Sequence, residues 1–168
     1  LVNHCKVSIY EGMKTEEIAK LAVLTTRSFI ERDPNYDVIT ARLFLMALYK
    51  EVIGKKYVLV DLDKNYRESF IKNIHLGVKI GRLSPDLLEF DLELLSKELM
   101  PRRDQLLAYR GLQTLYDRYF LTGDGGHRLE TPQSFWMRVA MGLAIKESEK
   151  EKWAVEFYKI LSALRFMS

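Results

Sequence analysis

The stretch from residue 131 to residue 145 constrains the fold of this chain more than any other. Thr131 followed by Pro132 predicts a helix start, because a threonine hydroxyl can accept a hydrogen bond from first-turn amides and proline suits the first helical position. From residue 135 to 145 every residue except Arg138 is apolar or glycine, on all faces of the predicted helix. A bilayer span needs about 20 such residues. The sequence therefore predicts a helix buried inside protein.

Arg138 is the one charged residue in the apolar part of this predicted helix. A guanidinium in apolar surroundings requires a carboxylate or several carbonyl oxygens to accept from its donors. We expect a structural ion pair with an acidic residue from a neighbouring helix. Direct contact with a phosphate group is the alternative.

Helical spacing of apolar residues continues through most of the chain. Thr15 is the expected N-cap of the first helix. Residues 7–10 form a short β-like run, and residues 55–60 fit either a strand or an apolar linker. Besides the central helix, helices are predicted at residues 16–30, 36–52, 65–80, 85–99 with a break near 90–91, 103–116 and 153–164.

A glycine-rich turn at residues 123–126 separates two short β-like arms. A phosphate-binding loop would instead lead from a strand into a helix N-terminus, so a small hairpin is the better interpretation. The expected fold class is mainly α, an orthogonal helical bundle with one small β-hairpin.

Composition limits the classes of function. There are 26 basic against 23 acidic residues, and the net charge of +3 is too balanced to indicate nucleic acid or an anionic membrane as a partner. Cys5 is the only cysteine, which excludes an intrachain disulfide and fits a reducing compartment such as the cytoplasm. We find no set of catalytic residues and no metal-ligand spacing. Because the first residue is leucine, we expect the chain to be part of a longer one.

A candidate nucleotide site lies at the start of the first predicted helix. The turn Gly12-x-Lys14-Thr15 presents backbone amides and a hydroxyl, which suits a phosphate. Lys50 would reach this turn if the first two helices pack antiparallel. From the residues alone, a simple helix cap and a surface lysine are the favoured alternative.

Two groups of motifs resemble one known family. Pro132-Gln133-x-x-Trp136-Met137-Arg138-Val139-Ala140-x-Gly142, preceded by Tyr119-Phe120-Leu121, is similar to the segment just ahead of the catalytic barrel in class I ribonucleotide reductase large subunits. Tyr10-Glu11-Gly12-Met13-Lys14-Thr15, followed by Asp33-Pro34-x-Tyr36 and Ala41-Arg42-Leu43, is similar to the C-terminal part of that family's ATP-cone. The likeness covers nearly the whole chain in the family's order.

The resemblance implies that residues 1–54 are the C-terminal part of an ATP-cone regulatory domain and residues 55–168 an all-helical domain ahead of a ten-stranded α/β barrel. Members of the family reduce ribonucleoside diphosphates to deoxyribonucleotides by thiyl-radical chemistry, with ATP as activator and dATP as inhibitor. Thr15 and Lys50 match the threonine and the lysine that contact this effector nucleotide. The implied partners are the barrel of the same chain, a radical-generating small (beta) subunit and a second large subunit in a homodimer.

The resemblance also implies what this sequence lacks. The leading part of the cone and every catalytic cysteine of the family are absent, and Cys5 matches none of them, so the chain alone is expected to be catalytically inert. Packing against a barrel predicts an uncovered apolar face around Trp136, Met141, Trp153 and Phe157. The alternative is a free-standing α-helical protein-interaction module whose apolar surface binds a partner helix. The length of the open reading frame distinguishes the two.

Overall fold

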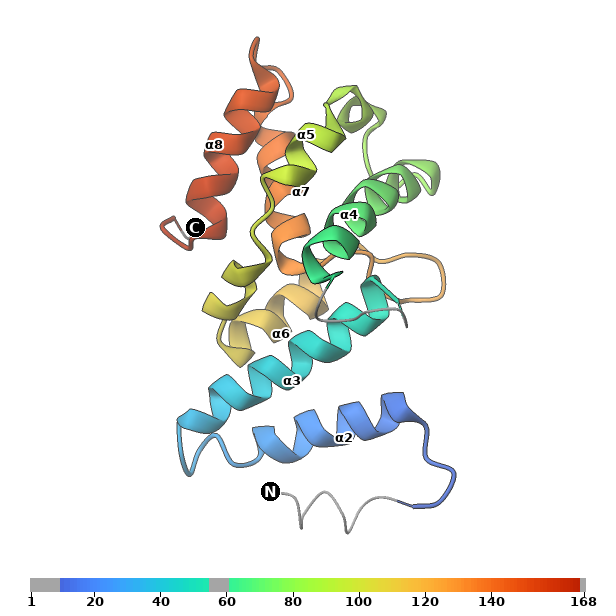
Figure 1. Cartoon of the computed structure of the whole chain (residues 1–168), viewed down its shortest axis with the longest axis vertical. Helices are drawn as coiled ribbons and strands as arrows, with labels where there is room; N and C mark the ends of the chain where they lie inside the picture. Colours follow the sequence, from blue (N-terminus) through green and yellow to red (C-terminus); the bar gives the residue numbers. More distant parts are fainter. Residues whose placement is uncertain (1–9, 55–60, 167–168) are drawn as a thin grey trace.

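The computed structural model describes residues 10–54 and 61–166, which form a succession of helices (Figure 1). The predicted mainly-α fold class is confirmed. Except for Tyr10, the β-like run predicted at residues 7–10 lies outside the described residues, as does the strand or linker predicted at 55–60. The elements are α2 (Thr15–Arg27), α3 (Asn35–Val52), α4 (Leu62–Lys79), the 3-10 helix η2 (Pro85–Glu89), α5 (Leu92–Lys97), the 3-10 helix η3 (Pro101–Leu106), α6 (Tyr109–Arg118), α7 (Pro132–Ala144) and α8 (Lys150–Ser162).

Helices α2 and α3 lie side by side at one end of the molecule (Figure 1). Asp33 Oδ1 accepts a 2.9 Å hydrogen bond from the backbone amide of Asn35, which fixes the turn that leads into α3. Val23 of α2 and Ala41 of α3 then pack with Tyr109 of α6 in a small buried cluster. The N-terminal helical pair is thereby joined to the rest of the fold.

The main core lies among α3 to α8, where α7 and α8 pack along each other. Large apolar side chains fill it from every one of these elements, and the least exposed are Leu48, Phe70, Leu95, Leu112, Met137 and Met141. Burying each such side chain contributes about 1.5–3 kcal/mol. The fold therefore has one large hydrophobic cluster and one small one, and Phe44 packs against both.

Two predicted helices are interrupted. The predicted helix at 85–99 is confirmed to break near 90–91, where Asp91 Oδ1 accepts a 2.9 Å hydrogen bond from the amide of Leu94 and starts α5. The predicted continuous helix at 103–116 is wrong. Pro101 instead opens η3, and α6 begins only at Tyr109 after the extended residue Leu107.

The predicted small β-hairpin is not supported. Within the described residues there is no strand, only an isolated antiparallel bridge between Thr122 and Arg128. The two groups that a longer ladder would pair have other partners: the amide of Leu121 donates to Glu130 at 2.7 Å, and the backbone oxygen of Leu129 accepts from Asn73 Nδ2 at 2.7 Å. The predicted glycine-rich turn does form, and Gly125 adopts a positive φ of 86°.

Helix α7 is not buried on all faces, contrary to the sequence prediction. Met141 is fully buried, whereas Leu143 is 60% exposed and Trp153 of the neighbouring α8 is 40% exposed. The reason is that α8 and the core cover one side of α7 and leave the other open.

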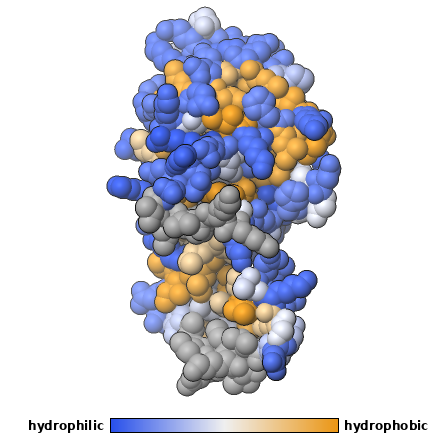
Figure 2. Space-filling view, turned by 45° about the vertical axis from the view of Figure 1, so that its right-hand side comes forward, coloured by the Kyte–Doolittle hydropathy of each residue, from blue (hydrophilic) through white to orange (hydrophobic). Residues whose placement is uncertain are grey.

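Apolar side chains also reach the surface elsewhere, both on the upper part of the molecule and around α2 and α3 below (Figure 2). No helix within the described residues is long and apolar enough to cross a membrane.

Candidate functional site

Lys50 and Thr15, which the sequence proposed as a pair, are in direct contact. Lys50 Nζ donates a 3.0 Å hydrogen bond to Thr15 Oγ1, which joins the last turn of α3 to the first turn of α2. The two helices therefore pack antiparallel, as the sequence analysis required. The pair lies at the surface, with Thr15 exposed and Lys50 half-buried.

The helix start at this pair differs from the predicted one. Thr15 is the first helical residue and Lys14 occupies the N-cap position, so the prediction of Thr15 as N-cap is wrong. Glu17 Oε2 accepts a 2.8 Å hydrogen bond from the Lys14 amide and performs the capping instead. The Thr15 hydroxyl is consequently free to accept from Lys50. Gly12, with φ of 88°, allows the sharp approach of the chain to this helix.

The chemistry of this corner suits an anion. The N-terminal end of α2 carries partial positive charge, and the ammonium of Lys50 adds a full charge beside it. Glu16 and Glu17 lie in the same helical turn and oppose an anion there. Lys50 therefore supplies the positive charge that is hydrogen-bonded to Thr15 at this corner.

A second polar feature, which sequence analysis missed, lies in the centre of the core. The Asp104 carboxylate of η3 is completely buried and accepts three hydrogen bonds. Tyr49 and Tyr66 donate to its Oδ2 at 2.6 and 2.9 Å, and Gln133 Nε2 donates to its Oδ1 at 2.8 Å. These residues come from α3, α4 and α7, so one carboxylate ties four elements together.

Burial dominates the electrostatics of this centre. It raises the pKa of Asp104 to about 7, although the hydrogen bonds from Tyr49, Gln133 and Tyr66 favour the charged form. Burial together with the nearby Asp104 charge also raises the pKa of Tyr66 well above its usual value. A carboxyl with such a pKa can exchange a proton near neutral pH.

The network continues from Gln133 into α8. Tyr158 donates a 2.8 Å hydrogen bond to Gln133 Oε1, and the same hydroxyl accepts one of 2.8 Å from the backbone amide of Met100. The amide of Gln133 itself donates to the Tyr66 hydroxyl at 2.9 Å. Each of these polar groups thus has a partner, as buried polar groups need. A buried glutamine directly after Pro132 was the one sequence signal for this network.

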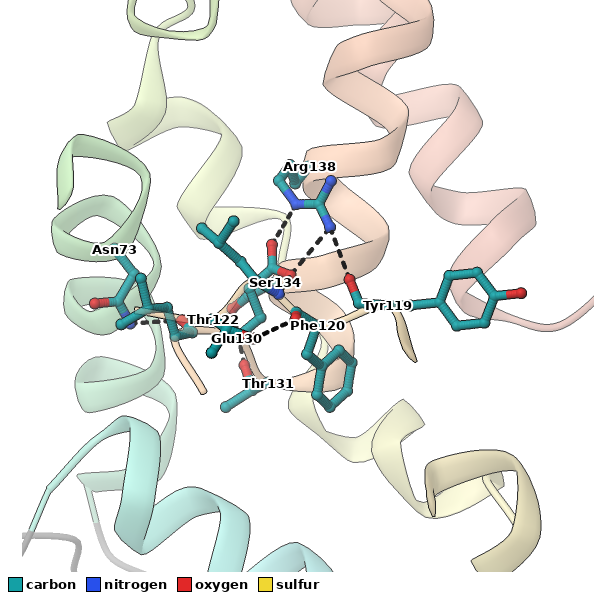
Figure 3. A network of polar contacts seen from close by, with 10 residues as sticks. Asn73, Tyr119, Phe120, Thr122, Glu130, Thr131, Ser134 and Arg138 are labelled. Atoms are coloured by element: carbon teal, nitrogen blue, oxygen red, sulfur yellow. Dashed lines mark hydrogen bonds and ion pairs between the residues drawn. The ribbon is translucent and has the colours of Figure 1, made fainter. Parts of the chain in front are cut away.

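Arg138 forms the ion pair that the sequence predicted, but with an unexpected partner. Its guanidinium donates from Nε to one oxygen of Glu130 and from Nη2 to the other at 3.0 Å (Figure 3). The predicted origin of the carboxylate in a neighbouring helix is wrong, because Glu130 lies in the segment that leads into α7. Thr131 does occupy the N-cap position of α7, but its hydroxyl forms a 2.8 Å hydrogen bond with the Ser134 hydroxyl and accepts from no backbone amide.

Around this ion pair the segment before α7 is held from both sides. Arg138 Nη2 also donates to the backbone oxygen of Tyr119 at 3.4 Å, and Asn73 Nδ2 of α4 donates to that of Leu129 at 2.7 Å (Figure 3). Because Nε and Nη2 of Arg138 both have protein acceptors, phosphate contact is not needed to satisfy them. Within the described residues no group of histidine, cysteine, aspartate and glutamate side chains could hold a metal ion.

Comparison with known proteins identifies the chain. Residues 105–168 match the family model described as the ribonucleotide reductase all-alpha domain. The ribonucleoside-diphosphate reductase subunit alpha of Chlamydia muridarum is 43% identical over 160 residues, which cover 95% of this chain. The chain belongs to the ribonucleotide reductase large-subunit family.

More distant relatives of the reductase family align over the same extent. The subunit alpha of Helicobacter pylori strain J99 is 36% identical over 96% of the chain, and that of Enterobacteria phage T4 is 27% identical over 96%. The chain spans only 15% of the length of the chlamydial relative and 20% of the Helicobacter one. The region that matches the reductase all-alpha domain contains the Arg138–Glu130 pair and Gln133, whereas Thr15 and Lys50 precede it.

Proposed function

We propose that this chain is the N-terminal regulatory and scaffold portion of the large subunit of a ribonucleoside-diphosphate reductase. The whole subunit would reduce ribonucleoside diphosphates to deoxyribonucleoside diphosphates by thiyl-radical chemistry, under control of ATP and dATP. Support comes from the names of relatives that align with 95% of the chain or more at 36–43% identity. On this proposal residues 1–54 are the C-terminal part of an ATP-cone and residues 55–168 an all-helical domain.

The effector site is proposed at Thr15 and Lys50. The observation that carries this assignment is the 3.0 Å contact between Lys50 Nζ and Thr15 Oγ1, which places an ammonium and a hydroxyl together at a helix N-terminus. In this proposal Lys50 attracts the phosphates of ATP or dATP, and Thr15 accepts or donates a hydrogen bond beside them. The reductase resemblance matches both residues to effector contacts.

The scaffold role is proposed for the open side of α7 and α8. Leu143 and Trp153 expose apolar surface there, at 60% and 40% of their full accessibility. We propose that the catalytic barrel of the same subunit covers it, while a radical-generating small subunit and a second large subunit complete the enzyme. A free-standing interaction module would expose the same surface, but the alignment with reductase subunits favours the scaffold.

Isothermal titration of the full-length subunit with ATP and with dATP tests the effector assignment. Lys50→Ala is expected to weaken binding of the tighter nucleotide by about tenfold or more, since loss of a charged hydrogen-bonding partner costs about 1.5–3 kcal/mol. Lys72→Ala is the matched control, because Lys72 is an exposed lysine on α4. Equal affinities for the Lys50→Ala and Lys72→Ala variants would remove Lys50 from the site.

A further inference from the structure

An open cleft of about 970 Å³ lies between α3, α4 and the chain from α5 to η3. Figure 1 shows these elements around the middle of the molecule, away from the first turn of α2 where Thr15 lies. The volume of the cleft falls at the upper end of the range for small-molecule sites, about 300–1,000 Å³. Arg42 of α3 and Arg67 of α4 both line it.

These two arginines are incompletely bonded. Nη1 of Arg42 and Nε of Arg67 are buried from solvent, yet neither has a hydrogen-bond partner within the described part of the chain. A buried donor without an acceptor costs about 1–3 kcal/mol, more when it is charged, so such groups are rare in folded proteins. Arg138, by contrast, has both a carboxylate and a carbonyl as acceptors. Both guanidinium groups therefore line the cleft, and each keeps one buried donor without an acceptor.

The carboxylates that line the same cleft do not supply these acceptors. These carboxylates are Asp61, Asp63, Glu68 and Glu93, and Glu68 Oε1 lies 4.0 Å from Lys64 Nζ in an exposed pair. Within the described residues neither guanidinium forms an ion pair with any of them. A ligand that brings its own anionic oxygens would pair with the two guanidinium groups, whereas a cation would be repelled by them.

We propose that this cleft binds a small phosphate-bearing molecule whose oxygens accept from Arg42 and Arg67. Guanidinium forks match phosphate oxygens in geometry and charge. Lys97 and Arg102 add positive charge at the rim. The acidic side chains of the lining suit hydroxyl groups of the same ligand, which favours a phosphorylated sugar over inorganic phosphate alone. This site is independent of the Thr15 and Lys50 site and does not rest on the proposed function.

The test is calorimetric titration of the full-length subunit with inorganic pyrophosphate and, separately, with ribose 5-phosphate. We expect one binding equivalent that Arg42→Gln and Arg67→Gln each weaken by at least about tenfold. Arg110→Gln is the matched control, since Arg110 is exposed on α6 and does not line the cleft. Lys50→Ala should leave this equivalent unchanged. Tighter binding of ribose 5-phosphate than of pyrophosphate would identify the phosphorylated-sugar class.

Arg42→Lys is a second, more conservative variant for the same titration. Because Arg42 has an unpartnered donor in the free protein, the Arg42→Lys variant should fold normally and still bind the ligand more weakly. Binding that is unchanged in Arg42→Gln, Arg67→Gln and Arg42→Lys would overturn the proposal. Loss of the binding equivalent in Lys50→Ala alone would also overturn it, because the anion would then bind at Thr15 and Lys50 instead of in the cleft.

Discussion

Tyr49 of α3 donates a 2.6 Å hydrogen bond to the fully buried carboxylate of Asp104 in η3, 55 residues further along the chain. Tyr49 directly precedes Lys50, so the part of α3 that carries Lys50 is anchored to the buried Asp104 carboxylate. The position of Lys50 beside Thr15 is thus linked through α3 to the order of the core.

Tyr49→Phe should lower the free energy of unfolding by about 1–3 kcal/mol, because a buried carboxylate loses one of its three donors. Denaturant titration of the 168-residue chain measures this. Tyr36→Phe is the control, since the Tyr36 hydroxyl has no hydrogen bond within the described residues and its ring lies against Phe29. A loss as large for the Tyr36 variant would contradict the role given to the Tyr49 hydroxyl.

Asp104→Asn should change how stability depends on pH. The pKa of Asp104 is raised by burial to about 7, above its ordinary value of 3.8, so the folded protein binds the proton more tightly than the unfolded chain. Stability from this group is therefore greatest at low pH and is lost as the pH rises from about 4 to about 7. The difference between wild type and Asp104→Asn should show that slope, up to about 4 kcal/mol in all. A pH-independent difference would show that Asp104 keeps its charge in both states.

Arg138→Met should lower the free energy of unfolding by about 3–5 kcal/mol, because it leaves the buried Glu130 carboxylate without its counter-ion. The double variant Arg138→Met with Glu130→Met should recover only part of this loss. The amide of Leu121 then lacks its acceptor, since it donates to Glu130 at 2.7 Å. Thermal unfolding of wild type, the two single variants Arg138→Met and Glu130→Met, and the double variant measures the coupling, and additive losses would contradict a buried pair.

Gly142→Ala should stabilise the isolated 168-residue chain by about 0.5–1 kcal/mol. Gly142 is exposed inside α7, and a Cβ added there meets no atom within 4 Å, so only the backbone entropy of glycine is removed. Calorimetric melting checks this result. Gly142→Trp should be tolerated in the isolated chain but lower the melting temperature of the full-length subunit if the barrel covers this face. Equal tolerance in both would argue against that covering.

The sequence predicted contacts that follow from helix order. Helical spacing on both sides of Asp33-Pro34 requires two consecutive helices, and antiparallel packing then brings Lys50 to Thr15. The apolar run from residue 135 to residue 145, interrupted only by Arg138, likewise located the central helix correctly. These features depend on local patterns, which a single sequence contains.

Features that depend on distant residues could not be predicted in this way. Asp104 gathers donors from positions 49, 66 and 133, and nothing in the spacing of these residues marks them as neighbours. The hairpin prediction failed for the same reason, because Asn73 on α4 donates to the backbone oxygen of Leu129, which a longer ladder would pair with the amide of Leu121. The partner of Arg138 was misplaced because a short extended segment, rather than a helix, carries Glu130.

The most direct test of the account is the rate of ribonucleoside-diphosphate reduction by the full-length subunit with its small subunit, measured against ATP concentration. The account predicts that ATP raises the rate, and that Lys50→Ala shifts the half-effective ATP concentration upward by about tenfold while Lys72→Ala leaves it in place. Absence of diphosphate reduction, or the same ATP response in wild type and Lys50→Ala, would contradict it.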